Sequence, residues 1–600
     1  MEHKRKRIDC KMKKILEQIS EVVSEAFEAA GYERSYGKVT LSNRPDLCEY
    51  QCNGAMAAAK AYKKAPFEIA NAVVEKLAGN ELLAEAVCVM PGFINMKINP
   101  EFLAGYLNEM AASEKFGYEL PENPLSIVVD YGGANVAKPL HVGHLRPAII
   151  GESVKRICKY VGHNVIGDAH LGDWGLQMGQ VIEETKDRQP DLPYFDPDFK
   201  GEYPEEAPFT IEELSEIYPT ASAKCKVDEE FKQRAQEATF KFQNGDPGYT
   251  ALCRHITNVS KQDLKKNYDN LLVFFDLWKG ESDAQPYIDD MIDDMVKKGV
   301  AYESQGALVV DIAMEGDKKE YPPCIVRKSN GAAIYQTTDL ATIVERKKLY
   351  DPNQIIYVVD KRQDLHFIQV FRTARKAGLV ADDCKLDFLG FGTMNGKDGK
   401  PFKTRDGGVL KLETLIADIN QAVYERIIEN REISEEEARE NARIIGLAAL
   451  KYGDLSNQAS KDYVFDVDRF ISFEGNTGPY LLYTIVRIKS ILNKYADNGG
   501  NVDVANKVLA PVNDSERALM LQITKLNEML ENAYAEIAPH KICQYCYELA
   551  DAFNKFYHET KILTEENQER KESFIALIKL TRDIMLTCID LLGFEAPERM

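Results

Sequence analysis

Between residues 125 and 162, the spacing of apolar residues changes from that of a strand to that of a helix. Residues 125–129 form a short apolar run that ends at glycines, which predicts a buried β-strand. Residues 147–162 carry apolar side chains at helical spacing and end at Gly162, which predicts an amphipathic helix. The sequence KPLHVGHLR, residues 138–146, therefore lies where a strand leads into a helix. Ligands of open α/β sheets bind at this edge, beside the carboxyl ends of strands and the N-termini of helices.

The N-terminal part of the chain predicts a small α+β module. Residues 12–31 and 66–79 have the pattern of amphipathic helices, and residues 86–98 have that of a strand pair broken by Pro-Gly. We expect this module to span residues 1–120.

The later segments predict two further units. Apolar runs at 307–313 and 354–360 alternate with helical segments, which favours a parallel sheet with crossover helices over residues 121–415. Residues 416–600 have helical period almost throughout, which predicts a separate all-α domain.

Two segments of the predicted sheet domain are rich in acidic residues. Residues 186–250 also contain many prolines, which indicates an insertion or a polar excursion from the sheet. Residues 287–299 place four aspartates opposite an apolar helical stripe, so we interpret them as solvated side chains and not as metal ligands. The stripe consists of Ile288, Met291, Ile292, Met295 and Val296.

Composition excludes some classes of protein. Its 600 residues are 44% hydrophobic and 28% charged, which is typical of a soluble globular protein of two to four domains. No apolar run is long enough to span a membrane, and the basic N-terminus lacks the apolar stretch of a signal peptide. Twelve cysteines include one C-x-x-C, Cys543 and Cys546, without a second pair, so we expect reduced thiols in a cytoplasmic protein.

The net charge of −20 disfavours indiscriminate binding to nucleic acid. A nucleic-acid partner would have to meet local basic patches, and residues 4–14 and 396–408 are two candidates. Either patch is also compatible with an ordinary solvated face.

His141 and His144 are candidates for binding a polyphosphate. Three-residue spacing in a first helical turn puts both on one face, and Gly143 between them lets a flat ligand approach the backbone. A metal is disfavoured because the neighbouring sequence has no further ligand set, although a short pattern of this kind also fits two surface histidines. The chain has no G-x-G-x-x-G after the first strand and no P-loop. Nucleotide binding would therefore use this turn with a lysine-rich loop that contains Lys400, Lys403 and Arg405.

Longer strings resemble one family of enzymes. HVGH resembles the first signature of class I aminoacyl-tRNA synthetases, and KPFKTR resembles a degenerate form of the second, KMSKS-type signature. Taken together in order, the longer strings resemble arginyl-tRNA synthetases from about residue 40 to residue 600. These strings are DYGGANVAKPLHVGHLRPAIIGE, AIYQTTDLA, KRQDLHF, EGNTGPYLLYTIVRIKSIL, ELADAFNKFYHETKIL and LLGFEAPERM.

The resemblance implies a site for the arginine substrate. It assigns this role to Asp130, Asn135, Tyr335, Asp339 and Gln363. The chemistry agrees, because carboxylates match a guanidinium in a planar fork, and the two amides suit an ammonium and a carboxylate. An isolated aspartate at any of these positions would otherwise be read as a helix cap or a surface ion pair.

The resemblance also implies an ATP site. His141 and His144 would stabilise the reacting α-phosphate, and Gly143 would let adenine pack close. The second signature lacks its two usual lysines, and Lys138 stands where a lysine is thought to compensate in this family. The roles of Lys138, Lys400, Lys403 and Arg405 at ATP therefore stay open. Mg²⁺ is expected with ATP, without a metal site of the protein's own.

The terminal units resemble tRNA-contacting domains of the same family. Residues 1–120 would contact the tRNA elbow, and residues 416–600 would bind the anticodon. Tyr480, Tyr483 and Arg487 offer stacking and phosphate contacts on one helix, although aromatic residues at helical spacing are more often part of a core.

The resemblance implies a Rossmann-type catalytic domain and an arginine–tRNA ligase, which we expect to be a monomer. Another class I synthetase is the alternative within the family, and two candidate guanidinium carboxylates disfavour it. A catalytically silent tRNA-binding protein is disfavoured by the intact histidines. A nucleotidyltransferase would not need the long helical domain.

Overall fold

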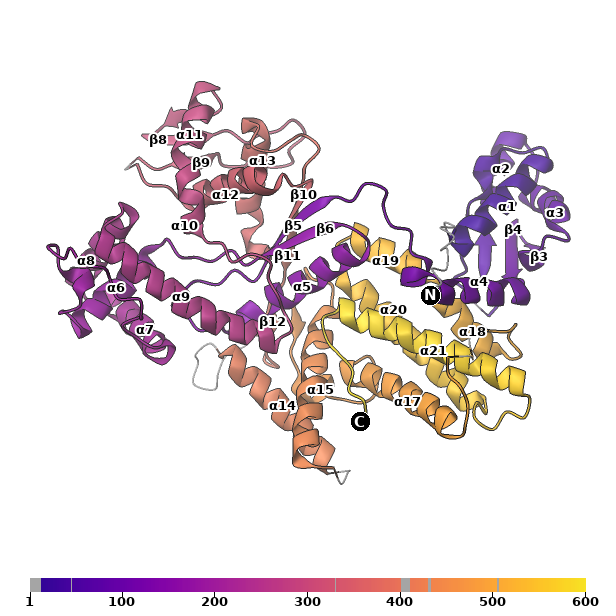
Figure 1. Ribbon diagram of the computed structural model, residues 1–600. Coiled ribbons are helices and arrows are strands. Elements are labelled where there is room, and N and C mark those ends of the chain that lie inside the picture. The colour runs from indigo at the N-terminus through magenta and orange to yellow at the C-terminus, as the bar shows by residue number, and fades with distance from the viewer. Residues whose placement is uncertain are drawn as a thin grey trace, which may run out of the picture.

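A four-stranded parallel sheet lies at the centre of the molecule (Figure 1). The computed structural model describes residues 12–44, 46–329, 331–400, 410–429, 433–503, 505 and 507–600. The strand order is β11-β10-β5-β6, and every neighbouring pair is parallel. The strands are β5 (Ser126–Asp130), β6 (Asn164–Asp168), β10 (Gln354–Asp360) and β11 (Lys385–Phe391).

Helices cover both faces of this sheet, as a parallel sheet requires. Successive side chains of a strand point to opposite faces. Ile127 and Val129 of β5 accordingly belong to the core shared with α5, whereas Val128 packs in a second core with α12 and α13. The covering helices are α5 (Leu145–Tyr160), α12 (Tyr335–Tyr350) and α13 (Asp364–Ala377).

The acidic, proline-containing insertion is a helical lobe. After α6 (Leu176–Arg188), the chain forms three helices that pack beside it, at the left of Figure 1. They are α7 (Ile211–Val227), α8 (Glu229–Gln243) and α9 (Pro247–Asn270). The last of these runs back to the sheet, where the Tyr268 hydroxyl donates a hydrogen bond to the Gly132 carbonyl over 2.5 Å.

The segment at 307–313 does not join the parallel sheet, which corrects the sequence interpretation. It forms β8 (Ala307–Val310), the middle strand of an antiparallel sheet with β7 (Tyr302–Ser304) and β9 (Cys324–Arg327). This small sheet packs with α11 (Ile288–Lys297), which follows α10 (Glu281–Ala284). The apolar stripe of α11 is buried as expected except at Val296, which is 45% exposed. The period of an apolar run does not reveal which sheet a strand enters.

The N-terminal module has the expected helices and strand pair. Its antiparallel sheet has the order β1-β2-β4-β3. The strands are β1 (Val39–Leu41), β2 (Tyr50–Cys52), β3 (Leu83–Val89) and β4 (Phe93–Ile98). The helices are α1 (Ile15–Ala29), α2 (Gly54–Tyr62), α3 (Pro66–Leu77) and α4 (Pro100–Ala112).

Among the described residues from 410 onward the chain is helical apart from one two-residue strand. This strand, β13 (Tyr463–Val464), pairs with β12 (Met394–Asn395), which follows β11. The helices are α14 (Leu412–Ile428), α15 (Glu435–Leu455), α16 (Val467–Phe470), α17 (Gly478–Asp497), α18 (Asp514–Thr524), α19 (Leu526–Ala535), α20 (Pro539–Glu559) and α21 (Gln568–Leu591). None of the described helices is long and apolar enough to cross a membrane.

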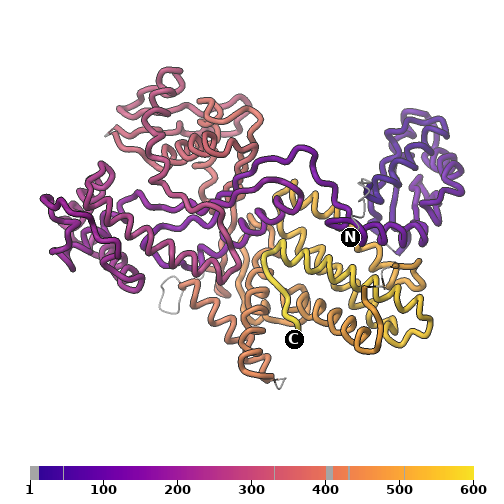
Figure 2. The backbone as a smooth tube through the Cα atoms, viewed as in Figure 1, coloured from indigo at the N-terminus to yellow at the C-terminus, as the bar shows by residue number. Residues whose placement is uncertain are grey.

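The N-terminal module lies against these helices, far along the sequence (Figure 2). Arg517 of α18 forms a forked pair with Glu49, with nitrogen–oxygen distances of 2.5 and 3.0 Å. Asn108 and Val508 exchange two hydrogen bonds of 2.7 and 2.8 Å. The module and the helical domain therefore share an ordered polar interface.

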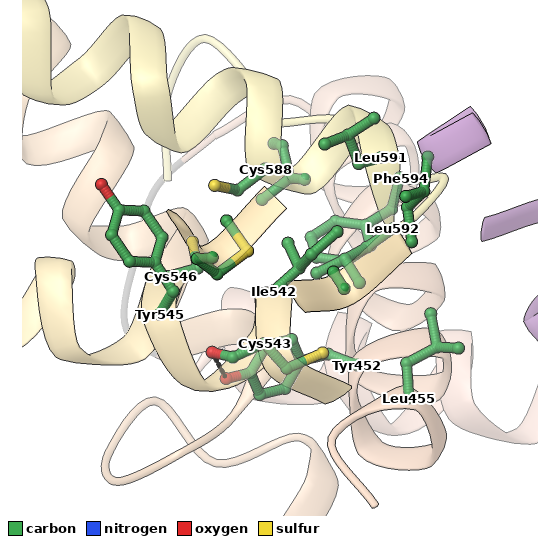
Figure 3. Close-up of a cluster of buried hydrophobic side chains, with 14 of the residues drawn as sticks. Tyr452, Leu455, Ile542, Cys543, Tyr545, Cys546, Cys588, Leu591, Leu592 and Phe594 are labelled. Atoms are coloured by element: carbon green, nitrogen blue, oxygen red, sulfur yellow. Dashed lines mark hydrogen bonds between the residues drawn. The ribbon is translucent and has the colours of Figure 1, made fainter. Parts of the chain in front are cut away.

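The cysteines of the C-x-x-C segment are core residues. Cys543 and Cys546 of α20 lie beside Cys588 of α21 among leucines and isoleucines (Figure 3). The Tyr452 hydroxyl donates to the backbone carbonyl of Cys543 over 2.9 Å. Burial raises the pKa of the Cys543 thiol well above its usual value. Every described cysteine is free.

Candidate active site

The two histidines lie at the predicted turn between a strand and a helix. His141 precedes a single 3₁₀ turn, Val142–His144, and α5 begins at the next residue. The backbone N–H of Gly143 donates to Nδ1 of His141 over 3.0 Å, and the N–H of His141 donates to Nδ1 of His144 over 3.1 Å. The ring centroids are 3.9 Å apart. Because each Nδ1 accepts a hydrogen bond, each neutral ring carries its proton on Nε2 and can donate from there.

Both rings are neutral at pH 7. Burial, together with smaller effects of His141 and Lys138, lowers the pKa of His144 to about 3. Burial and the nearby Lys138 ammonium also lower the pKa of His141. The pair therefore offers two hydrogen-bond donors, and neither ring carries a positive charge. Lys138 supplies the positive charge of the turn, and its Nζ lies 4.8 Å from the centre of the Tyr218 ring.

Gly143 is exposed at the tip of this turn. A Cβ at this position would lie 2.8 Å from a carbon of the His141 ring, which is closer than real contacts allow. A larger residue would therefore displace the His141 ring.

Two aspartates end neighbouring strands and share one internal partner. Asp130 and Asp168 lie side by side in the register of β5 and β6. The buried Arg346 of α12 donates to both, over 2.6 and 2.7 Å. Asp130 was predicted to hold a substrate guanidinium, and in the structure it already holds the guanidinium of Arg346.

A second group of acids lies beside the first. Burial is the main cause that raises the pKa of Glu281 to about 7; His170 opposes the rise, and the charges of Asp339 and Asp173 support it. Asp339, on the first turns of α12, pairs with the Nε2 of His366 over 2.5 Å. The carboxylates therefore outnumber the cations at this end of the sheet.

The remaining predicted substrate residues line the same region. Tyr335 begins α12 and is 69% exposed, and burial of its hydroxyl together with the Glu281 charge raises its pKa. Gln363 is exposed at the end of a 3₁₀ turn after β10, three residues before His366. Asn135 is exposed and bridges to Gly172 through the backbone.

The lysine-rich loop connects this site with the helical domain. Lys397 pairs with Asp466 over 3.1 Å, and Lys400 is exposed. Lys403 and Arg405 lie outside the described residues, as does most of the basic patch at 4–14. Where the chain is described again, the N–H of Val142 donates to the carbonyl of Leu410 over 3.0 Å. The end of the loop is thus bonded to the histidine turn.

The three predicted tRNA residues come together on α17, close to α20. The Arg487 guanidinium lies 4.7 Å from the ring centre of Tyr483 and 5.0 Å from that of Tyr557. Asn554 donates to the Tyr480 hydroxyl over 2.9 Å and accepts from Arg487. Tyr483 stays 37% exposed, so one ring of this cluster faces solvent.

Sequence reasoning missed Glu281, Arg346, His366 and His170. A weak signal existed for His170. It lies two residues after Asp168, which ends a strand, just as predicted substrate residues come soon after Asp130 at the end of the neighbouring strand. No comparable signal marks Glu281 or Arg346, since each reaches the site only through helix packing. Among the described residues, no group of three or more histidine, cysteine or carboxylate side chains is placed to hold a metal ion.

Three family models match the chain in order. The arginyl tRNA synthetase N terminal domain matches residues 13–98, and the DALR anticodon binding domain matches residues 481–600. The catalytic domain of the class I (R) tRNA synthetases matches residues 108–467, more than half of the chain.

Whole-length relatives agree with these matches. The arginine–tRNA ligase of Agathobacter rectalis is 60% identical over 597 residues, which cover 98% of this chain and 100% of that protein. The arginine–tRNA ligase of Alkaliphilus oremlandii is 58% identical, with the same coverage. Among solved structures, the arginyl-tRNA synthetase of Plasmodium falciparum superposes with a TM-score of 0.81 at 26% identity, covering 98% of this chain and 100% of that one.

Proposed function

The chain belongs to the arginyl-tRNA synthetase family, and from that premise we propose how its residues divide the reaction. The enzyme activates arginine with ATP to arginyl-adenylate and transfers the arginyl group to tRNA(Arg), with AMP and pyrophosphate as the other products. The expected class I fold, with its parallel sheet and its N- and C-terminal domains, is confirmed.

We propose that Glu281 and Asp339 bind the guanidinium of substrate arginine. The supporting observation is the excess of carboxylates at the end of the sheet, where the pKa of Glu281 rises to about 7 beside Asp339 and Asp173. A cation bound between these acids would replace the missing counter-charge and draw Glu281 into its ionised form. Asp130 would support the site indirectly, because it already accepts a hydrogen bond from Arg346.

Tyr335 would close the pocket over the guanidinium, since it is exposed beside Glu281. Asn135 and Gln363 would hold the ammonium and carboxylate groups of the substrate, and both are exposed at strand ends of the sheet. This arrangement would direct the substrate carboxylate toward the histidine turn.

At ATP, the Nε2–H groups of His141 and His144 would donate to the α-phosphate as its charge develops. Gly143 would allow the adenine to pack on the turn. Lys138 would contribute the positive charge that the second signature lacks, together with Lys400, Lys403 and Arg405 of the loop. Mg²⁺ would enter with the phosphates of ATP.

The other units would position the tRNA. We propose that residues 1–120 contact the elbow, that residues 121–415 form the catalytic domain, and that residues 416–600 bind the anticodon through Tyr480, Tyr483 and Arg487. The exposed ring of Tyr483 beside Arg487 supports this assignment. We further propose that the enzyme acts as a monomer in the cytoplasm.

Competition by citrulline tests the arginine site. Citrulline has the shape of arginine with a neutral urea group, so it should inhibit aminoacylation much more weakly than charged analogues do. Glu281→Gln should reduce this discrimination, because it removes a carboxylate that distinguishes charge. Asp294→Asn, on the exposed face of α11, is the matched control and should retain it. Equal inhibition by neutral and charged analogues would refute the carboxylate site.

A further inference from the structure

Glu281, the first residue of α10, is held by a segment that lies far from it in the sequence. The backbone N–H of Glu281 donates to the carbonyl of Leu171 over 3.0 Å, and the N–H of Leu171 donates to the carbonyl of Lys279 over 2.8 Å. Residues 277–280 run parallel to residues 168–171, which start at the last residue of β6. The position of Glu281 is therefore set from the end of the central sheet.

The carboxylate of Asp173 holds the residue that follows Glu281. It accepts hydrogen bonds from the backbone N–H and the hydroxyl of Ser282, over 2.9 and 2.7 Å. Asp173 is 8% exposed, so both bonds lie where little water reaches. Because Leu171 binds the N–H of Glu281 and Asp173 binds Ser282, the backbone of Glu281 is fixed on both sides.

Gly280 allows the carboxylate of Asp173 to come this close to the start of α10. A Cβ at position 280 would lie 2.5 Å from one oxygen of Asp173, which is closer than real contacts allow. A side chain at this position would therefore push Asp173 away from Ser282. The glycine and the aspartate form one fitted contact directly before Glu281.

Capping of the helix alone does not account for the burial of Asp173. The helix α10 is only 4 residues long, and the carboxylate of Asp283 already accepts from the N–H of Gly280 over 2.9 Å. Burial raises the pKa of Asp173, because a buried site disfavours the charged form of a carboxyl group. A carboxylate kept in such a place is better explained by its effect on the neighbouring Glu281.

Charged and titratable groups from two elements act on Glu281. His170 and Asp173 belong to the segment after β6, and Tyr335 and Asp339 belong to α12, which packs against α10 (Figure 1). The charges of Asp173 and Asp339 favour the protonated form of Glu281, whereas His170 favours the ionised form. Asp173 therefore acts on Glu281 both through its hydrogen bonds to the backbone and through its charge.

We propose that Asp173 is the positioning residue of Glu281 and fixes the backbone that presents this carboxylate to the guanidinium of substrate arginine. Both oxygens of Asp173 are bonded to Ser282, so Asp173 acts through Glu281 and not by contact with the substrate. Its negative charge also favours a protonated Glu281 until a cation binds. The proposal rests on the arginine site proposed above, in which Glu281 binds the guanidinium.

A double-mutant cycle tests whether Asp173 acts through Glu281. KM for arginine and KM for ATP are measured by aminoacylation for the wild type, Asp173→Asn, Glu281→Gln and the double variant. Asp173→Asn should raise KM for arginine about tenfold, the effect of one lost charge-assisted hydrogen bond, and leave KM for ATP unchanged. In the Glu281→Gln background the same change should add little, because the carboxylate that it positions is gone. Equal effects in both backgrounds would overturn the proposal.

The pH profile of KM for arginine separates positioning from packing. Asp173→Asn removes a charge that raises the pKa of Glu281, so the rise of KM on acidification should begin at a lower pH than in the wild type. Ser282→Ala keeps this charge and removes one hydrogen bond, so it should raise KM for arginine without the downward shift. Asp269→Asn, beside Lys265 on the surface of α9, is the control and should change neither. An unshifted profile in Asp173→Asn would leave it a purely structural role and overturn the proposal.

Thermal melting shows whether each variant is folded. If Asp173→Asn does not fold, Ser282→Ala takes its place in the cycle with Glu281→Gln, and additive effects there would overturn the proposal. Failure of the arginine site gives a different result, because Glu281→Gln would then leave KM for arginine unchanged by itself.

Discussion

The guanidinium of Arg346 lies 2.6 Å from the carboxylate of Asp130, at the strand end where a substrate guanidinium was expected. The same nitrogen reaches Asp168 over 2.7 Å. The enzyme therefore holds an arginine of its own between the two strand-end carboxylates. Glu281 and Asp339 are the carboxylates that we propose to bind the guanidinium of the substrate.

Asp130→Asn should therefore reduce stability more than it affects arginine binding. The change removes the negative charge of one acceptor of the buried Arg346, and a hydrogen bond between charged groups contributes about 1.5–3 kcal/mol to the free energy of unfolding. Denaturant unfolding measures this loss, and KM for arginine should rise less than in a variant of Asp339. A tenfold rise in KM with unchanged stability would mean that Asp130 binds the substrate directly.

Replacing Asp339 should affect arginine alone. Asp339→Ala removes a carboxylate from the proposed guanidinium site, and KM for arginine should rise about tenfold or more. KM for ATP should stay near its starting value, because the histidine turn is untouched. Steady-state aminoacylation with each substrate varied measures both. If KM for arginine and KM for ATP rose by the same factor, misfolding would explain the result, and Asp339 would lose its assignment to the arginine site.

His144→Ala should lower kcat by about 10²–10³, the size of one lost oxyanion-type donor. Binding of arginine and ATP should change much less, because the Nε2–H acts most strongly on the charge of the transition state. Single-turnover adenylate formation checks this directly. Unchanged turnover would exclude His144 from the reaction.

The pH dependence of arginine binding should report on Glu281. Its pKa of about 7 means that the group is largely protonated below pH 7, and only the carboxylate holds a guanidinium well. KM for arginine should therefore rise about fivefold from pH 7 to pH 6. Glu281→Gln should raise KM at pH 8 and flatten the profile. The same pH dependence in Glu281→Gln would assign the titration to another group.

The turn that carries HVGH was predictable because its signal is local. A strand pattern, a glycine and a helical pattern follow one another within about forty residues, and His141 and His144 lie where that order placed them. The β8 strand was misplaced because its apolar run is equally compatible with either sheet. Arg346 and Glu281 were missed because helix packing brings them to the site from positions far along the chain. The pairing of Asp130 with Arg346 could not be predicted, because the pattern of one strand says nothing about which helix packs against it.

The histidine turn is joined through two backbone hydrogen bonds to the start of α14, the helix that leads into the helical domain. Val142 donates to Leu410, and Leu412, the first residue of α14, donates to Leu140, each over 3.0 Å. A tRNA bound to the helical domain could therefore shift the end of the lysine-rich loop against the ATP site. In this coupling, tRNA would bind the active state of the enzyme more tightly than the inactive state and would shift the population toward the active state.

ATP–pyrophosphate exchange, measured for each of the twenty amino acids with and without tRNA, tests the account most directly. We expect exchange with arginine only, and only when tRNA(Arg) is present. Lysine should fail even with tRNA, because a single ammonium cannot match a site built for a guanidinium. Strong arginine exchange without tRNA would contradict the coupling between the helical domain and the histidine turn. Exchange with a different amino acid would contradict the arginine site itself.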